Sequence, residues 1–166
     1  MMFEVILMAI GANLPTEARR NPLQTCEWAV EQLASIPGLH LRRVSRWYET
    51  RPLPVSDQPP FINGVALLAG MAEPEALLHS MHLIEEVAGR TRSALNAART
   101  LDLDLLAMDR LVIRTSRLTL PHPRMQDRAF VLAPLCDVLP DWRHPVLGLS
   151  AEKFLSTVSD QAILAL

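Results

Sequence analysis

The sequence predicts an α+β fold, a ferredoxin-like split β-α-β sandwich with additional C-terminal elements. Three observations predict it: a continuous apolar run near the start, two segments with apolar residues at helical spacing, and strand-like segments between and after them. The resulting order β-α-β-β-α-β is typical of the ferredoxin-like motif. Because the chain has 166 residues, we expect a single domain over 1–166, with residues 143–166 as a C-terminal extension that packs on it.

The first two elements are marked by apolar residues and by the residues that interrupt them. The apolar run from Val5 to Ile10 ends at Gly11 and is typical of a central strand that is covered on both faces. A helix is expected to begin at Asn21-Pro22, where asparagine can cap and proline can occupy the first turn. Its helical spacing continues until Pro37-Gly38, which ends it.

The middle of the chain alternates between strand and helix signals. Residues 39–48 alternate in patches and predict a strand, whereas four prolines over residues 50–60 predict a loop. Residues 61–69 predict a second strand of the same kind. A second helix is expected to begin at Pro74, and Gly89 is its expected C-cap.

The remaining elements are shorter. Residues 101–105 alternate and predict a strand, followed by a short hairpin region around residues 109–110. Residues 118–120 predict a further short strand, and a last helix is expected over residues 128–138.

The run Arg99-Thr100-Leu101-Asp102-Leu103-Asp104 carries the strongest functional signal. In a strand its leucines point into the core, and Asp102 and Asp104 share the other face with their Cα atoms about 7 Å apart. Two such carboxylates repel each other unless a cation lies between them or one is protonated. The alternative is an edge strand with a solvated acidic face. Three arginines nearby favour a site for metal and polyphosphate: Arg90, Arg92 and Arg99.

Composition and charge narrow the class of protein. A net charge of −2 and a pI near 6.2 give no reason to expect nucleic acid or an acidic membrane as partner. Lys153 is the single lysine, so an anion site upstream must use arginine and backbone N–H groups. Cys26 and Cys136 fit buried thiols in a reducing cytoplasm. Residues 5–10 are too short to span a bilayer and do not resemble a signal peptide.

Several common catalytic motifs are absent from the sequence. It contains no G-x-x-x-x-G-K-[ST] phosphate loop, no G-x-G-x-x-G after a strand, no paired C-x-x-C and no G-x-S-x-G. Phosphoryl chemistry would therefore depend on metal and arginine.

The histidines leave alternatives open. His79 and His82, with Glu85 and Glu86 one turn further on, have a spacing that can bind zinc, although a solvated helix face explains it equally simply. His122 lies between two prolines that stiffen its loop, which suits either a functional or a structural histidine.

A series of short motifs follows in one order over roughly the first 140 residues. They are Gly11-Ala12-Asn13-Leu14, Tyr48-Glu49-Thr50 with Pro52, Asp57-Gln58-Pro59 with Phe61 and Asn63, Ile84-Glu85 with Gly89-Arg90 and Arg92, the run from Arg99 to Asp104, Leu118 to His122, Arg128, Phe130 to Leu132, and Pro134-Leu135. In this order and at these intervals they resemble the 6-hydroxymethyl-7,8-dihydropterin pyrophosphokinase family of folate synthesis, whose fold is a ferredoxin-like α+β sandwich.

The resemblance implies a transferase that moves the β,γ-pyrophosphoryl group of ATP to the pterin hydroxymethyl oxygen and releases AMP. It implies that two Mg²⁺ ions, held by Asp102 and Asp104, bridge the triphosphate of the co-substrate ATP. By resemblance, the catalytic residues are Arg90, Arg99, Asp102 and Asp104; the ATP-binding residues are His82, Arg92, Arg117, Thr119, His122 and Arg128; and the pterin-binding residues are Thr50, Leu53, Phe61, Asn63 and Phe130.

Within that resemblance, Phe61 and Phe130 would sandwich the flat pterin ring, and Asn63 would read its hydrogen-bonding edge. Asn13 and Glu85 would support the site, the alternatives being a turn asparagine and a surface glutamate. A solvated basic edge is the alternative for residues 110–128.

Three departures limit the resemblance. Ala12 stands where the family commonly has serine, Pro54 where it favours glycine, and residues 93–98 replace a longer stretch that carries tryptophan and glycine-proline. Residues 93–98 would therefore bury less apolar surface on closing over ATP. We expect a monomeric, cytoplasmic enzyme that acts on ATP and the pterin. A weakened paralogue that binds without efficient transfer, and an RNA-binding ferredoxin-like module, are the alternatives; the acidic pI and the lack of an aromatic-basic strand disfavour the module.

Overall fold

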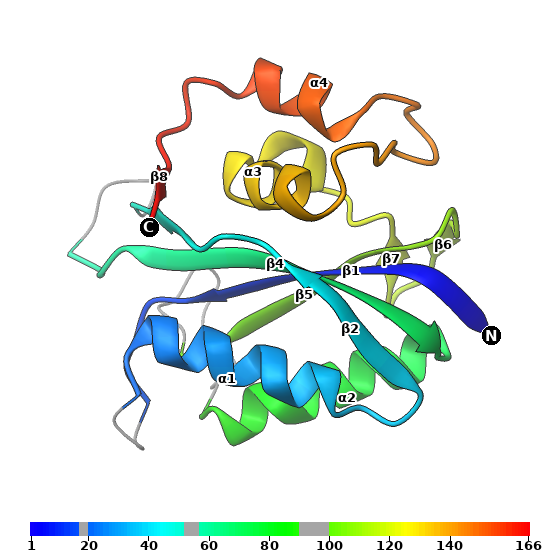
Figure 1. Ribbon diagram of the computed structural model, residues 1–166, viewed down its shortest axis with the longest axis horizontal. Helices are drawn as coiled ribbons and strands as arrows, with labels where there is room; N and C mark the ends of the chain where they lie inside the picture. The colour runs from blue at the N-terminus through cyan, green and yellow to red at the C-terminus, as the bar shows by residue number, and fades with distance from the viewer. Residues whose placement is uncertain (17–19, 52–56, 90–99) are drawn as a thin grey trace.

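A six-stranded antiparallel sheet separates two layers of helices in the computed structural model, which describes residues 1–16, 20–51, 57–89 and 100–166 (Figure 1). Strands β6 and β7 form a second, two-stranded sheet. Helices α1 and α2 cover one face of the sheet, and α3 covers the other with α4 outside it (Figure 1). The elements are β1 (Met2–Ala12), α1 (Pro22–Ala34), β2 (Leu39–Val44), β3 (Tyr48–Thr50), β4 (Phe61–Met71), α2 (Pro74–Val87), β5 (Asp102–Met108), β6 (Ile113–Arg114), β7 (Thr119–Leu120), a 3₁₀ turn (Met125–Asp127), α3 (Ala129–Val138), α4 (Ala151–Thr157) and β8 (Leu164–Ala165).

The strand order confirms the predicted α+β fold. The main sheet has the order β5-β1-β4-β3-β8, and β2 pairs with the other half of β4. Strand β1 thus lies between β4 and β5, the strands that precede and follow α2, as a split β-α-β arrangement requires.

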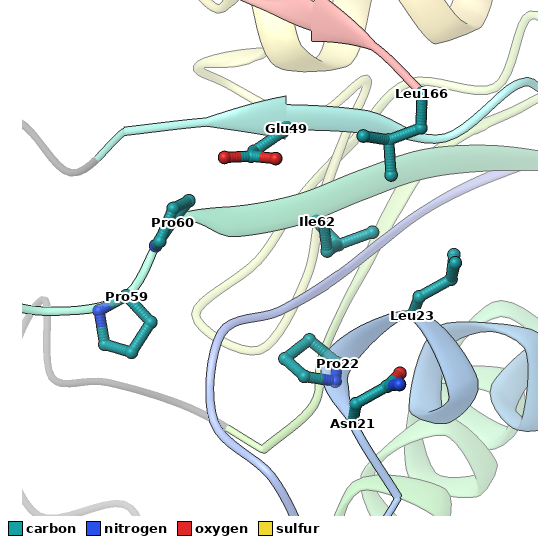
Figure 2. A pocket seen from close by; sticks show the side chains of 8 residues that line it. All are labelled: Asn21, Pro22, Leu23, Glu49, Pro59, Pro60, Ile62 and Leu166. Carbon is teal, nitrogen blue, oxygen red and sulfur yellow. The ribbon is translucent and has the colours of Figure 1, made fainter.

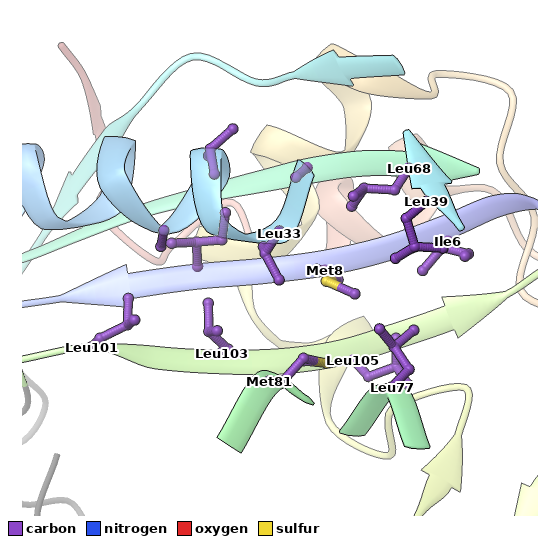
Figure 3. Close-up of a cluster of buried hydrophobic side chains, with 14 of the residues drawn as sticks. Ile6, Met8, Leu33, Leu39, Leu68, Leu77, Met81, Leu101, Leu103 and Leu105 are labelled. Carbon is purple, nitrogen blue, oxygen red and sulfur yellow. The ribbon is translucent and has the colours of Figure 1, made fainter. Parts of the chain in front are cut away.

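Strand β1 is central and is covered on both faces, as its apolar run predicted. Ile6, Met8 and Ile10 belong to the cluster under α1 and α2, where Leu33, Met81 and Leu103 contribute from neighbouring elements (Figure 3). Leu7 points the other way, into a second cluster formed with α3.

Both long helices begin where their capping residues stand. Asn21 Oδ1 accepts the Gln24 N–H at 2.9 Å, and Gln24 Oε1 accepts the Asn21 N–H at 2.9 Å, which forms a capping box at the start of α1. Helix α2 begins at the expected Pro74. Its C-cap is Ala88, and the expected residue, Gly89, follows with a left-handed φ of 88°.

The strand expected over residues 39–48 is interrupted, so that prediction is wrong in its extent. Strand β2 ends at Val44, and β3 begins only at Tyr48. Between them the Ser45 hydroxyl accepts the Val65 N–H at 2.9 Å and donates to the Arg46 carbonyl at 2.6 Å. A side chain that satisfies a strand N–H in this way breaks the ladder, which a patchy alternation does not reveal.

The C-terminal segment contacts the rest of the fold at two places. Helix α4 packs against α3, and β8 pairs with β3 so that Leu164 lies opposite Glu49. The Leu166 N–H donates to the Trp47 carbonyl at 2.9 Å. Within the described ranges, none of the helices combines the length and the apolar character needed to cross a bilayer.

Candidate active site

The two aspartates of β5 lie on the sheet face that α3 covers. Asp102 pairs with Gly11 and Asp104 with Ala9 on β1, and both carboxylate side chains are half-buried. The leucines that alternate with them are buried in the opposite cluster. The predicted alternation is therefore confirmed, and it presents two carboxylates from one strand on one face.

Glu85 supports the strand between the two aspartates. This residue of α2 is fully buried, and its Oε2 accepts the Leu103 N–H at 2.9 Å. Leu103 separates Asp102 from Asp104, so the contact anchors β5 at the acidic pair. Glu85 is not the surface glutamate that the sequence left open as an alternative.

His122 faces Asp104 from the loop after β7. Its Nε2 lies 4.0 Å from Asp104 Oδ1, and its Nδ1 accepts the Arg124 N–H at 3.1 Å. Burial, followed by the positive charges of Arg128 and Arg124, lowers the pKa of His122 to about 4, against a smaller opposing effect of Asp102. The ring is therefore neutral at pH 7, with its proton on the nitrogen that faces Asp104.

The other described residues expected to bind ATP have varied surroundings. Thr119 is half-buried on β7, and the half-buried Arg128 holds its guanidinium 5.5 Å from the Phe130 ring centroid. His82 is half-buried on α2. Arg117 is exposed and lies 4.0 Å from the carboxylate of Glu75, in the first turn of α2.

The expected pterin residues converge on β3 and β4. Asn63 and Thr50 are buried polar residues, and Asn63 Nδ2 donates to Thr50 Oγ1 at 2.8 Å. Phe61 lies opposite Thr50 and therefore on the same face of the sheet. Asn63 comes two residues after Phe61 on β4, so it is on this face as well. Phe130, in the first turn of α3, is half-buried against the cluster on this same face.

Asn13 holds the chain next to this group. It is fully buried, and its Nδ2 donates to Gln58 Oε1 at 3.3 Å and to the Pro59 carbonyl at 3.2 Å. These bonds tie the end of β1 to the segment that leads into β4. Asn13 is thus more than a turn asparagine.

Register brings the acidic residues and the amide into one row. Gly11 of β1 lies opposite Asp102 on one side and opposite Asn63 on the other. Directly opposed residues of antiparallel strands share a face. Asp102 and Asn63 are therefore two strand spacings apart, about 10 Å, with only a glycine between them.

The sequence did not single out Asp137 of α3. Tyr48 donates its hydroxyl hydrogen to Asp137 Oδ2 at 2.7 Å, and Arg46 pairs with the same carboxylate at 3.1 Å. Burial and Asp137 raise the pKa of Tyr48 to about 12. The contacts of Tyr48 and Arg46 with Asp137 tie α3 to β3, the strand that carries Thr50. The sequence offered no signal for it beyond an acid in an otherwise apolar helix.

A separate hollow of about 370 Å³ lies on the other side of β3 and β4 (Figure 2). Glu49 and Ile62 line it, and they alternate with Tyr48, Thr50, Phe61 and Asn63 along their strands. Alternation places the hollow on the α1 face, away from the row of Asp102 and Asn63. It is lined by Asn21, Pro22, Leu23, Glu49, Pro59, Pro60, Ile62 and Leu166.

Some predicted residues lie outside the described ranges. They are Leu53, Arg90, Arg92 and Arg99, together with Pro52, Pro54 and residues 93–98. In the part of the chain that the structure describes, no three His, Cys, Asp or Glu side chains gather closely enough to hold a metal by themselves. The zinc alternative on α2 therefore gains no support, and a metal at Asp102 and Asp104 would need further oxygen ligands.

Comparison with known proteins gives one consistent family. The model of the 7,8-dihydro-6-hydroxymethylpterin-pyrophosphokinase family matches residues 7–140. A 2-amino-4-hydroxy-6-hydroxymethyldihydropteridine pyrophosphokinase of Pseudomonas aeruginosa is 39% identical over 144 residues, covering 87% of this chain and 86% of that protein. The Synechocystis protein of the same name is 37% identical over 141 residues, covering 85% of this chain and 72% of that protein.

Longer proteins also match. The folic acid synthesis protein fol1 of Pneumocystis carinii is 35% identical over 160 residues, which are 96% of this chain and 21% of that protein. The crystal structure of wild-type Plasmodium falciparum HPPK-DHPS matches with a TM-score of 0.70 at 13% identity, covering 95% of this chain and 45% of that one. This chain thus spans about a fifth of the fungal protein and less than half of the parasite one, and at such identity the structural match shows the fold alone.

Proposed function

The chain belongs to the 7,8-dihydro-6-hydroxymethylpterin-pyrophosphokinase family, and we propose from this premise that the row across β5, β1 and β4 carries its reaction. The function is that of a 6-hydroxymethyldihydropterin pyrophosphokinase in folate synthesis. The β,γ-pyrophosphoryl group of ATP passes to the hydroxymethyl oxygen of the pterin, and AMP leaves.

Asp102 and Asp104 fit a magnesium site. Their half-buried carboxylates supply the oxygen donors that hard cations prefer, and they stand on one face of β5. Two protein carboxylates with substrate phosphates and water form a usual ligand set for Mg²⁺. Two bound ions would neutralise phosphate oxygens and orient the attacking alcohol.

The phosphate and nucleotide side is completed by cationic and polar residues. His122 keeps its Nε2–H directed at Asp104, where it can orient that carboxylate or donate to a phosphate oxygen. Thr119 lies on β7 and Arg128 directly precedes α3, and both are proposed to contact the nucleotide, together with His82 and Arg117. Arg90, Arg92 and Arg99 are proposed to hold the triphosphate, since guanidinium groups bind phosphate oxygens two at a time.

The pterin is proposed to lie between Phe61 and Phe130, over Asn63 and Thr50, with Leu53 beside it. Because Asn63 Nδ2 bonds Thr50, the amide oxygen is left to accept a donor from the pterin edge. The Thr50 hydroxyl accepts that bond and can donate its own hydrogen to the ligand. A flat ring with donors and acceptors on one edge suits this group of residues.

The single observation that carries these roles is the register of Asp102, Gly11 and Asn63. Asp102, the proposed metal ligand, and Asn63, the proposed pterin contact, are about 10 Å apart on one face, a span that one pterin with its hydroxymethyl arm can bridge. In the described residues nothing favours the weakened paralogue. Family membership removes the reason for the RNA-binding alternative.

The test replaces Asp102 and Asp104 separately by asparagine, which preserves shape and removes the charge. We expect AMP release from Mg-ATP and the pterin to fall at least about a thousandfold in each variant, since metal-held charge stabilisation supplies several kcal/mol. Asp160→Asn, which removes an exposed carboxylate, is the matched control and should retain full activity. Asparagine variants that keep circular dichroism and activity together would contradict the metal assignment.

We also propose that the chain acts as a monomeric single domain over 1–166 in the cytoplasm, with residues 143–166 as an extension and without nucleic acid or membrane as partner. Light scattering after size exclusion checks the oligomeric state, and a mass of twice 18.5 kDa would contradict the monomer.

A further inference from the structure

The residues of β1 that lie between the carboxylates of β5 and the amide of Asn63 are small. On this face β1 contributes Gly11 between Asp102 and Asn63, and Ala9 between Asp104 and Val65. Ala9 keeps some solvent exposure although it lies on the central strand of the sheet. On this face β1 therefore adds little side-chain volume between Asp102 and Asn63.

Gly11 is not required by its backbone conformation. Its φ is outside the left-handed region, in contrast to Gly38, Gly70, Gly89 and Gly148, so alanine could adopt the same backbone without strain. Space is the constraint instead. A Cβ built on Gly11 would lie 2.9 Å from Asn63 Oδ1, closer than such atoms pack, whereas its next neighbour is the Ile62 carbonyl oxygen at 3.6 Å.

The atom that this Cβ would displace, Asn63 Oδ1, is the proposed hydrogen-bond acceptor for the pterin. Asn63 Nδ2 is held by Thr50 Oγ1 at 2.8 Å, so the amide cannot turn without losing that bond. Its Oδ1 lies close to Gly11. A methyl group at position 11 would push this acceptor away from its place or break the bond to Thr50.

We propose that Gly11 is a positioning residue for the pterin: its missing side chain keeps Asn63 Oδ1 in place as an acceptor. The inference rests on the proposed role of Asn63 in pterin binding. Gly11 itself makes no bond to the substrate, and acts through Asn63.

The test is Gly11→Ala in the full chain, with the pterin as the titrated ligand in the presence of an unreactive Mg-ATP analogue. We expect the Kd for the pterin to rise by about tenfold or more, since a displaced acceptor leaves a ligand donor unpaired. The Kd for the Mg-ATP analogue should stay within about threefold of the parent, because a nucleotide contact with Asn63 is not involved. A general loss of structure would move both constants.

A double-mutant cycle with Asn63→Ala separates positioning from a merely structural effect. Once Oδ1 is absent, the Cβ at position 11 has no atom to displace, so Gly11→Ala should change the pterin Kd by less than about twofold in that background. An equal loss in both backgrounds, or an unchanged Kd in the single variant, would overturn the proposal.

Three further outcomes are distinguishable. If Gly11→Ala does not fold, the double variant should fold as well as Asn63→Ala, and failure of both would show that the Asn63 contact is not the cause. If Asn63→Ala alone leaves the pterin Kd unchanged, the proposed function of Asn63 fails. If Asn63→Ala weakens binding while Gly11→Ala does not, only the inference about Gly11 fails.

Discussion

Replacing Tyr48 by phenylalanine should destabilise the protein through one oxygen atom. The ring is 4% exposed, and phenylalanine fills the same space. The hydroxyl donates to Asp137 Oδ2 at 2.7 Å and accepts from an Arg46 nitrogen at 3.0 Å. Hydrogen bonds to charged groups contribute about 1.5–3 kcal/mol. Because Asp137 retains its pairing with Arg46, we expect a loss near the lower end, about 1.5–2 kcal/mol.

The same variant should change how stability depends on alkaline pH. Burial, helped by Asp137, raises the pKa of Tyr48 from 10 to about 12, so the folded protein binds the phenolic proton more tightly than the unfolded chain. Its contribution is fully present below pH 10 and is lost as the pH rises from 10 to 12. Phenylalanine has no proton to lose, so the variant should lack this alkaline decline.

Urea unfolding followed by tryptophan fluorescence measures both effects. With a urea dependence of about 2 kcal/mol per molar, the midpoint should fall by about 0.7–1 M at neutral pH. The difference between the two proteins should then narrow above pH 10. Arg46→Gln, which removes an exposed partner of the same carboxylate, is the control and should shift the midpoint less. Equal midpoints for Tyr48→Phe and its parent, or parallel alkaline slopes, would refute the reasoning.

Three further predictions concern the site and the strands around it. Burial lowers the pKa of His122 to about 4, so the apo protein should lose stability as the pH falls from 6.5 toward 4, by at most about 3 kcal/mol; His122→Gln should remove most of that loss in urea unfolding across this range. Gly64→Ala would place a Cβ 2.5 Å from the Trp47 ring and should cost about 1–3 kcal/mol of unfolding free energy, with an unchanged midpoint as the contrary result. Asn13→Ala removes the donor to the Pro59 carbonyl. The KM for the pterin should rise several-fold, which corresponds to the loss of about one hydrogen bond, and kcat should change little. A fall in kcat at constant KM would contradict this prediction.

The sequence predicted the elements well wherever one physical signal dominated. Asn21-Pro22 carries a cap and a first-turn proline, and α1 begins there. The apolar run around Val5 to Ile10 is buried on both faces, although β1 extends further at each end. The interruption at Ser45 was missed, because the hydroxyl that replaces a ladder bond pairs with Val65, which is distant in the sequence.

The site was predictable only in part, because it also depends on pairing between residues that are distant in the sequence. The alternation of Asp102 and Asp104 follows from the two-residue period of one strand. That Asn63 shares their row depends on the register of β1 with two neighbours, which local patterns do not specify. Gly11 stood in a motif that supported the family resemblance, yet its relation to Asn63 Oδ1 is visible only once three strands are aligned.

The register also explains how the proposed active site can form on one face of a sheet that carries hydrophobic clusters on both faces. Along β1 the residues on the α3 face are Leu7, Ala9 and Gly11, so side-chain size falls toward the end where Asp102 and Asn63 stand. On the opposite face the large apolar residues continue, and the cluster under α1 and α2 stays closed. The small residues of this face thus lie on a strand whose opposite face packs against α1 and α2, and Asp102 and Asn63 stand on strands rather than on loops. Such support fixes the separation of carboxylate and amide before any substrate binds, and this is what an in-line transfer between two bound ligands requires.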